Sequence, residues 1–262
     1  ASTGSGTGTL GLNMVNSTGV ADAAGNAVGN VPFTGAVYTI DRTAPTVLTI
    51  ALVGPNPTNT ASVQFTVTFS STVVGVSTSN FAIATSGLGG TPAITGISGS
   101  GAVYTVTAST GSGDGTLGLN MVNTTGVTDA AGNAVSNVPF TGSVFTLNRT
   151  PPTLQAITRT DANPSNAASV HFNVIFSENV VGLSAGNFTL VNGGLGGTPA
   201  ITGVSGSGTS WVVTASTGSG DGTLGLNLAN STGLTDTAGN AVSNVPVTGP
   251  VYTLDRTAPT VS

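Results

Sequence analysis

The stretch Ser62–Phe69 reads SVQFTVTF and determines the type of structure that this chain can form. Large apolar residues occupy every second position, and uncharged polar residues lie between them. Because side chains alternate between the two faces of a β-strand, this pattern predicts a strand with one face in a core and the other toward solvent. The same pattern returns as SVHFNVIF at Ser169–Phe176, and 169 − 62 = 107.

That spacing of 107 residues runs through the whole chain. DRTAPT at 41–46 returns as NRTPPT at 148–153 and again as DRTAPT at 255–260, with 148 − 41 = 107 and 255 − 148 = 107. Residues 1–40 and 108–147 differ at only seven positions. A period of this length is too long for a solenoid unit and suits a whole small domain. The repeat therefore predicts a string of autonomous domains.

Within one copy, short strand patterns are separated by turn sequences. Gly-Pro-Asn-Pro at 54–57 and Gly-Ser-Gly-Asp-Gly at 111–115 are rich in turn-forming residues, and no stretch is convincingly helical. Such even spacing predicts an antiparallel β-sandwich, with a closed barrel as the alternative. The predicted strands are 46–53, 62–69, 81–83, 93–97, 102–108, 116–122 and 140–147.

Domain boundaries placed at the repeated TAPT or TPPT sequence divide the chain into four parts. Residues 44–150 and 151–257 are complete domains, 1–43 hold only the last strands of a repeat, and 258–262 begin another. A two-strand piece cannot bury a sandwich core by itself. Two interpretations follow. We favour the interpretation that the chain is one segment of a longer tandem array. Alternatively, neighbouring subunits complete the two-strand fragment by strand addition.

The composition excludes several classes of protein. The chain has 4 Lys plus Arg, all of them Arg, 9 Asp plus Glu, one His and no Cys, for a net charge of -5. Nucleic acid is excluded as a natural partner because phosphate binding needs many basic residues. Cysteine nucleophiles and thiolate metal sites are absent, and a lone His171 makes a Ser–His–Asp array very hard to build. We therefore expect no enzyme and no cofactor.

Apolar residues are never gathered into a run long enough for a membrane helix. No stretch approaches the roughly 18 consecutive apolar residues that a span requires. No basic segment followed by an apolar one is visible, so the sequence shows no signal peptide, although the chain starts inside a repeat and a targeting segment could precede it. We expect no membrane span in this segment.

The order of the motifs resembles a known family. APTV at 44–47, GSGDGTLGLN at 111–120 and DAAGNAV at 129–135 are similar to the bacterial immunoglobulin-like (Big-type) tandem repeats of large secreted surface proteins, adhesins and extracellular filaments. The likeness extends over essentially the whole chain. It implies an all-β chain of tandem immunoglobulin-like antiparallel β-sandwich domains, at the cell surface or outside the cell, with adjacent repeats or further copies of itself as partners.

Related adhesin repeats carry calcium at their junctions, so the resemblance raises the same question for the aspartates here. Calcium needs six to eight oxygen ligands. However, Asn148 replaces the junction Asp of the other copies, and Thr7 replaces the loop Asp. We therefore expect no metal and interpret these residues as turn-formers, with calcium as the less favoured alternative. The residues concerned are Asp22, Asp41, Asp114, Asp129, Asp221, Asp236 and Asp255.

Five Asn residues lie in the N-x-Ser/Thr sequence that accepts N-linked glycans. Asn16, Asn123 and Asn230 are spaced by 107 residues and are therefore structurally equivalent, whereas Asn148 and Asn187 occur in single copies. Each of the equivalent three follows an apolar strand, where a glycan could project into solvent. Covalent glycans would also hydrate a surface with few charges. We treat all five as glycosylation candidates.

The junctions keep an Arg and a Pro in every copy. An Arg beside an Asp at a boundary could form an ion pair with the next domain and set the angle between domains. Proline fixes φ and favours extended backbone before it, which stiffens the connection. We therefore expect a semi-rigid rod. The junction residues are Arg42, Pro45, Arg149, Pro152, Arg256 and Pro259.

Some residues break the symmetry between copies. His171 stands where the preceding copy has Gln64, so we expect an exposed strand residue. Trp211 aligns with Tyr104, which predicts a core position, with sugar stacking as a secondary interpretation. A distinct ligand site would break the repeat, and Glu178, Trp211 and Arg159 are where we would expect it.

Taken together, these features predict a structural protein. Our main interpretation is a component of an extracellular or cell-surface filament, sheath or stalk built from tandem immunoglobulin-like domains. The alternative is a spacer or carbohydrate-binding repeat region of a surface adhesin.

Overall fold

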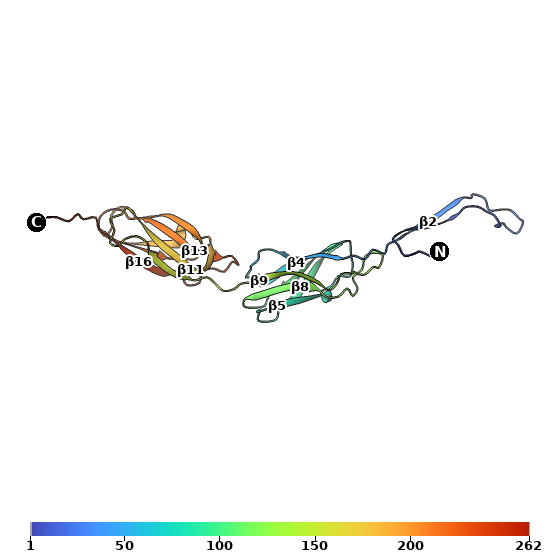
Figure 1. The fold of residues 1–262 in the computed structure, drawn as a ribbon, viewed down its shortest axis with the longest axis horizontal. Coiled ribbons are helices and arrows are strands. Elements are labelled where there is room, and N and C mark those ends of the chain that lie inside the picture. The colour runs from blue at the N-terminus through green and yellow to red at the C-terminus, as the bar shows by residue number, and fades with distance from the viewer. Residues whose placement is uncertain (1, 262) are drawn as a thin grey trace.

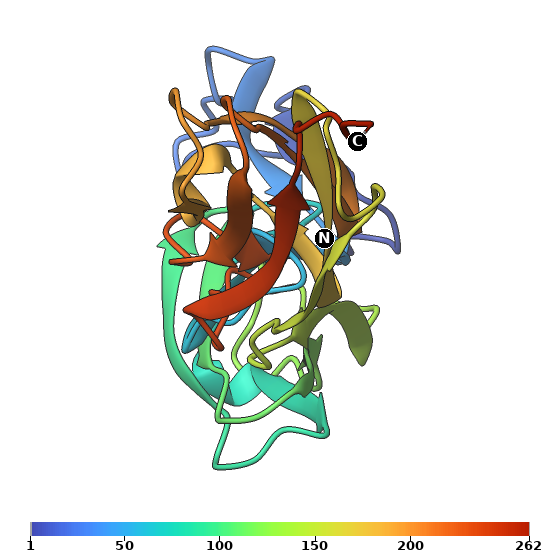
Figure 2. The same cartoon turned by 90° about the vertical axis from the view of Figure 1, so that its left-hand side faces the viewer.

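The computed structural model describes residues 2–261, and its regular structure is β throughout apart from two single-turn 3-10 helices. An N-terminal hairpin and two β-sandwich domains follow one another along the long axis of the molecule (Figure 1). Figure 2 looks along that axis, so the parts lie behind one another. None of the helices in residues 2–261 is long and apolar enough to cross a membrane.

The first sandwich, which we call domain A, contains seven strands in two antiparallel sheets. One sheet has the order β3-β4-β7-β6 and the other has the order β5-β8-β9. This division matches the ABED and CFG sheets of a constant-type immunoglobulin domain. The strands are β3 (Val47–Val53), β4 (Ser62–Phe69), β5 (Phe81–Ser86), β6 (Ala93–Ser100), β7 (Val103–Ser109), β8 (Gly115–Met121) and β9 (Phe140–Leu147), and the 3-10 turn η1 (Thr78–Asn80) precedes β5.

The alternating apolar residues of β4 line the core of domain A from one of its two sheets. Its four apolar side chains, at 63, 65, 67 and 69, are at most 5% exposed. The facing strand β8 contributes Leu117, Leu119 and Met121, all fully buried. Phe65 meets Phe145 edge to face, with ring centroids 5.3 Å apart, the geometry that aromatic pairs prefer. The two sheets are therefore held together by side chains that the sequence assigns to the inner faces.

The second sandwich, domain B, repeats this arrangement. Its strands are β10 (Leu154–Arg159), β11 (Ser169–Val181), β12 (Phe188–Gly193), β13 (Ile201–Ser216), β14 (Gly222–Leu228), β15 (Thr235–Asp236) and β16 (Val247–Leu254), and η2 (Ala185–Asn187) precedes β12. The long strand β13 covers the positions that β6 and β7 occupy in domain A. Most of its core residues are the counterparts of those in domain A, and the ring centroids of Phe172 and Tyr252 lie 5.2 Å apart.

The N-terminal hairpin consists of β1 (Gly8–Met14) and β2 (Phe33–Ile40), paired antiparallel. It corresponds to β8 and β9 of domain A, but no second sheet covers it. Leu12 is 81% exposed and Tyr38 72% exposed, whereas their counterparts Leu119 and Phe145 are 0% and 1% exposed. This hairpin therefore presents to solvent the face that both complete domains bury.

The predicted fold class is confirmed. The structure is all-β, with tandem immunoglobulin-like sandwiches, and two separate sheets with open edges replace the alternative of a closed barrel. Most predicted strands agree with the observed ones within two residues, and β5 and β6 each extend three residues beyond prediction, to Ser86 and Ser100.

The contrast between hairpin and domain predicts different costs for the same substitution. Leu119→Ala should lower the free energy of unfolding of domain A by about 2–5 kcal/mol, because it leaves a cavity in a packed core. Leu12→Ala, at the equivalent exposed position, should change the stability of both domains by less than about 0.5 kcal/mol. Urea denaturation of the two variants measures this difference, and equal losses would contradict the structure.

Candidate functional site

The sequence Asp-x-Ala-Gly-Asn forms the same compact turn in every copy. In domain B, one carboxylate oxygen of Asp236 accepts the backbone N–H groups of Ala238 and Asn240, each at 2.8 Å. The other oxygen accepts Nδ2 of Asn240, also at 2.8 Å. Asp129 and Asp22 make the same three contacts in their copies, within 2.8–3.0 Å. The turn is therefore an Asx-type structure that the local sequence specifies.

This turn of domain B is where domain A contacts it. Asn240 donates through Nδ2 to the backbone oxygen of Asn148 at 2.9 Å, and Nδ2 of Asn148 donates to Asp236 Oδ2 at 3.2 Å. Asn59, in the loop between β3 and β4, donates to Asn240 Oδ1 at 3.0 Å. Asp236 is 2% exposed and Asn240 9% exposed. Three side-chain hydrogen bonds thus cross the boundary in a site that excludes most water.

The equivalent turn is less covered at the other positions in the chain. Asp22 is exposed, Asp129 is half-buried and Asp236 is buried. Between the hairpin and domain A, a bond of 3.2 Å from Asn133 Nδ2 to the backbone oxygen of Asp41 is the counterpart of the Asn240 contact. Burial of the turn therefore increases with the amount of sandwich that precedes it.

The replacement of Asp by Asn at position 148 has a direct physical role. A carboxylate there could not donate to Asp236 and would place two negative charges together. The amide instead donates to Asp236 Oδ2. The substitution that weakened the prediction of a calcium site thus supplies a hydrogen-bond donor to the junction.

The aspartates considered for calcium are spread over turns and junctions. Residues 2–261 contain no group of three or more His, Cys, Asp or Glu residues arranged to hold a metal ion. The Asp114 carboxylate accepts the backbone N–H of Arg149 at 2.5 Å and the hydroxyl of Thr150 at 2.5 Å. Asp221 makes the equivalent contacts with Arg256 and Thr257. Asp41 and Asp255 each accept the backbone N–H two residues later.

The junction arginines bind their own domains. Arg149 donates through Nη1 to Gly113 O at 2.6 Å and through Nη2 to Thr60 O at 3.0 Å and Thr110 Oγ1 at 2.5 Å. Arg256 repeats these contacts in domain B with Gly220, Ala167 and Thr217. All three of these bonds lie within domain A, so the Arg149 guanidinium fastens the end of β9 to the rest of that domain.

The prolines lie where the chain enters each domain. Pro45 and Pro152 are buried, and their carbonyl groups accept the N–H groups of Ser136 and Ser243 at 3.0 Å. Pro259, near the C-terminal end of the described residues, is exposed. The connection between β9 and β10 is thus short and hydrogen-bonded to the domain that follows it.

Four of the five glycosylation candidates use Nδ2, the atom that would carry the glycan, in hydrogen bonds. Asn123 donates to Ser79 O at 2.9 Å and Asn230 to Gly186 O at 3.0 Å. Asn187 is 1% exposed and donates to Thr232 O, and Asn148 donates to Asp236. A glycan at these four positions would have to displace contacts of the folded domain. Asn16 is exposed, and its Oδ1 accepts the N–H of Thr18.

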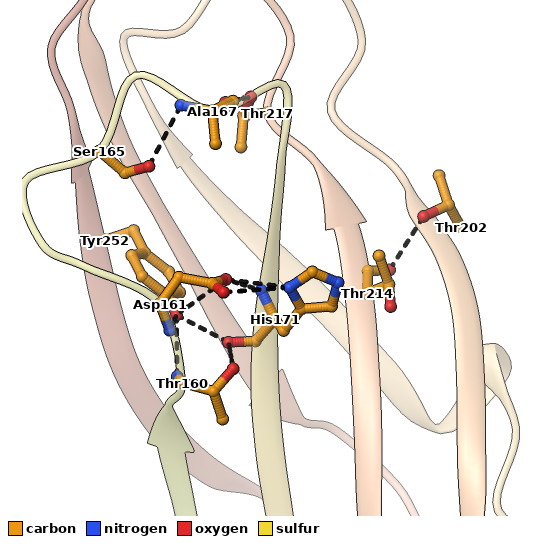
Figure 3. Close-up of polar contacts among 9 residues, drawn as sticks. All are labelled: Thr160, Asp161, Ser165, Ala167, His171, Thr202, Thr214, Thr217 and Tyr252. Carbon is orange, nitrogen blue, oxygen red and sulfur yellow. Dashed lines mark hydrogen bonds and ion pairs between the residues drawn. The ribbon is translucent and has the colours of Figure 1, made fainter.

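Domain B has a polar cluster that domain A lacks (Figure 3). His171 Nδ1 lies 3.0 Å from Asp161 Oδ2, and the Tyr252 hydroxyl donates to His171 O at 2.7 Å. The same hydroxyl accepts the N–H groups of Thr160 and Asp161. Because 161 − 107 = 54, 171 − 107 = 64 and 252 − 107 = 145, Gly54, Gln64 and Phe145 occupy these places in domain A. The cluster fixes the loop between β10 and β11.

The other copy-specific residues have structural contacts. The ring of Trp211 packs against the core of domain B, half-buried, and its indole N–H donates to Gly208 O at 3.1 Å. Arg159 lies over the ring of Tyr252 at 5.8 Å and donates to Val251 O. Glu178 is a half-buried residue of β11. Trp211 was expected in the core and lies half-buried against it. The Asp161–His171–Tyr252 cluster was not predicted, although three coincident differences between the copies could have indicated it.

The similarities of this chain to known proteins are confined to solved structures. No protein-family model matches the chain, and no curated protein matches it. Among solved structures, the Escherichia coli adhesin FdeC is 13% identical over 84% of this chain and 68% of its own, with a TM-score of 0.37. The Yersinia pseudotuberculosis adhesin InvE is 15% identical over 83% and 64%, with a TM-score of 0.30. Domains 5–6 of the S-layer protein SbsC are 16% identical over 81% and 100%, with a TM-score of 0.21.

These similarities concern the fold alone. The assignment of immunoglobulin-like sandwiches to this chain rests on the sheet order of its two domains.

The carboxylates of Asp114 and Asp221 make the stability of domains A and B depend on pH. The Thr150 hydroxyl and the Arg149 backbone N–H hold the pKa of Asp114 below its usual value of 3.8, and Thr257 and Arg256 lower the pKa of Asp221 in the same way. The ionised carboxylates therefore stabilise the fold above that value, and this stabilisation is lost as the pH falls through the folded-state pKa. Thermal unfolding between about pH 6 and about pH 2 measures the loss.

A double variant, Asp114→Thr with Asp221→Thr, provides the matched comparison. It reproduces the first copy, in which Thr7 Oγ1 accepts the N–H of Arg42 at 3.1 Å without a titrating group. The melting temperature of this variant should be lower near pH 6 and should fall less on acidification. If the melting temperature of the variant falls on acidification as much as that of the unsubstituted chain, these two carboxylates do not cause the loss of stability in acid.

Proposed function

We propose that this chain is a load-bearing spacer or stalk segment of a cell-surface or extracellular protein. The observation that carries the proposal is the buried hydrogen-bonded junction between domains A and B. Free linkers between domains contain flexible Gly/Ser-rich sequence, whereas here the connection between β9 and β10 is short and contacts both domains. Such a junction holds two sandwiches end to end and transmits force and orientation between them.

The path of the chain through each domain suits the same role. The chain enters domain A at β3 and leaves it after β9, on the side where domain B follows (Figure 1). Thr58 donates its N–H to Thr146 O and accepts the N–H of Asn148, both at 3.0 Å, in a parallel bridge beside β9. Tension along the chain would load these bonds together, because the bridged segments are pulled in opposite directions along their length.

The surface composition fits an extracellular structural protein. Charged residues make up 5% of the chain, so lateral contacts between copies would require little ionic surface to lose its water. We also propose, more specifically, that such lateral contacts join many chains into a filament or sheath. Carbohydrate binding receives less support, because the indole of Trp211 packs against the core and its N–H is bonded within the domain.

Substitution of Asn148 tests the proposal directly. The chain lacks Cys, so Ser98→Cys and Ser205→Cys, at equivalent exposed positions of domains A and B, accept two spin labels. The native junction should give a narrow distance distribution. Asn148→Asp should broaden it, because the new carboxylate cannot donate to Asp236 and repels it.

Asn166→Asp is the control, because it makes the same change of charge at an exposed position at the far end of domain B. It should leave the distribution unchanged. A broad distribution in the unsubstituted junction would contradict a rigid spacer and would indicate domains that move independently.

A further inference from the structure

A small hollow at one end of domain A lies beside the loop that joins β3 and β4. Its volume is about 200 Å³, which is below the range of about 300–1,000 Å³ typical of pockets for drug-sized ligands. None of the residues that line it is charged. The apolar part of the lining includes Val53, Pro55 and Phe145, and the polar part includes Thr58, Thr60 and Gln64.

In domain B a hydroxyl group of the protein itself lies at the equivalent place (Figure 3). Phe145 is the counterpart of Tyr252 and lacks its hydroxyl. The Tyr252 hydroxyl accepts the N–H of Thr160 at 3.0 Å and that of Asp161 at 2.9 Å, and it donates to His171 O at 2.7 Å. A hydroxyl has one donor and two acceptor positions, so all three are used inside domain B.

Domain A keeps the backbone groups that bind this hydroxyl in domain B. Val53 and Gln64 are paired in the sheet, as their counterparts in domain B are. Within residues 2–261, the N–H of Gly54 has no acceptor, and no side chain donates to the backbone oxygen of Gln64. Gly54 also lacks the carboxylate that its counterpart Asp161 extends toward His171. Domain A therefore has a donor and an acceptor placed for a hydroxyl that does not belong to its own chain.

The polar side of the hollow is richer in hydroxyl and amide groups than the same region of domain B. Thr60 stands where domain B has Ala167, and its Oγ1 donates to Ser62 O at 2.9 Å and lies 3.2 Å from Thr58 Oγ1. Within the described residues, the Gln64 amide makes one long contact, of 3.4 Å from Nε2 to Thr107 Oγ1. Hydroxyl and amide groups both donate and accept, so these side chains suit a ligand with several hydroxyl groups.

We propose that this hollow is a binding site for a small neutral polyol no larger than one sugar ring. One ligand hydroxyl takes the place of the Tyr252 phenol oxygen, accepting the N–H of Gly54 and donating to the backbone oxygen of Gln64. The C–H groups of the ligand pack against Phe145 and Pro55, and its other hydroxyls bond to Thr60 and to the Gln64 amide. A charged ligand is excluded, because no residue of the lining could pair with its charge.

A titration of the 15N-labelled chain with glycerol, D-glucose, D-galactose and D-mannose tests the proposal. At least one of these polyols should shift the amide resonances of Gly54 and Gln64 and saturate in the millimolar range, because a shallow site binds a small ligand weakly. The amide of Asp161 is the internal control. It should not shift, because the Tyr252 hydroxyl already accepts its N–H.

Phe145→Tyr should abolish these shifts, because the new hydroxyl would form within domain A the bonds that Tyr252 forms in domain B. The resonances of 115–121 report in the same spectra that domain A remains folded. Phe33→Tyr is the matched control. It adds the same hydroxyl to a ring of the N-terminal hairpin that is 57% exposed, and it should leave binding unchanged.

Thr60→Ala provides a second variant, because domain B folds with Ala167 at this position. It should weaken binding several-fold through the loss of one hydroxyl of the lining. The proposal is overturned if none of the four polyols shifts Gly54 and Gln64, or if Asp161 shifts equally, since the polyols would then act through the bulk solvent. It is also overturned if Phe145→Tyr or Thr60→Ala binds as the unsubstituted chain does.

The polyol site goes beyond the spacer role and is tested separately from it. Asn148→Asp changes none of the residues that line the hollow, and the spin labels at 98 and 205 report on the junction alone.

Discussion

The mutual burial of two apolar sheet faces is the constraint on which the rest of this structure depends. With no disulfide and 5% charged residues, each domain is held by the contact between a four-stranded and a three-stranded sheet. Phe65 and Leu119 are fully buried through that contact, while Leu12, with the same local sequence as Leu119, is 81% exposed. Burial, rather than local sequence, therefore decides whether a pair of strands belongs to a stable domain.

The junction uses polar groups in a different way. The Asp236–Asn240 turn is specified locally, because its carboxylate satisfies backbone donors within five residues. Once formed, it presents an amide and a carboxylate to the end of the preceding domain, where Asn148 and Asn59 bond to them. A turn motif thus becomes an interdomain contact without any charged pair. None of these hydrogen bonds joins two opposite charges, and salt screens a contact that is buried from water only weakly.

Much of the fold could be predicted from the sequence, because alternation of apolar residues, turn sequences and a 107-residue repeat all point to the same sandwich. The core positions 63, 65, 67 and 69 follow from the pattern of one strand. The contacts of Arg149 and Asn148 could not be predicted, since both residues lie at a boundary and the sequence does not show to which side each turns. The Asp161–His171–Tyr252 cluster was missed because its members come from three separate parts of the chain.

The central claim is that domains A and B form one rigid body. Backbone 15N relaxation over residues 44–257 tests it most directly, because an elongated rigid pair and two tethered spheres tumble differently. The account predicts that both domains share one rotational diffusion tensor, with its long axis along the molecule. Separate and shorter correlation times for the two domains would contradict it, and would mean that the hydrogen bonds of Asn148, Asn240 and Asn59 do not hold the junction.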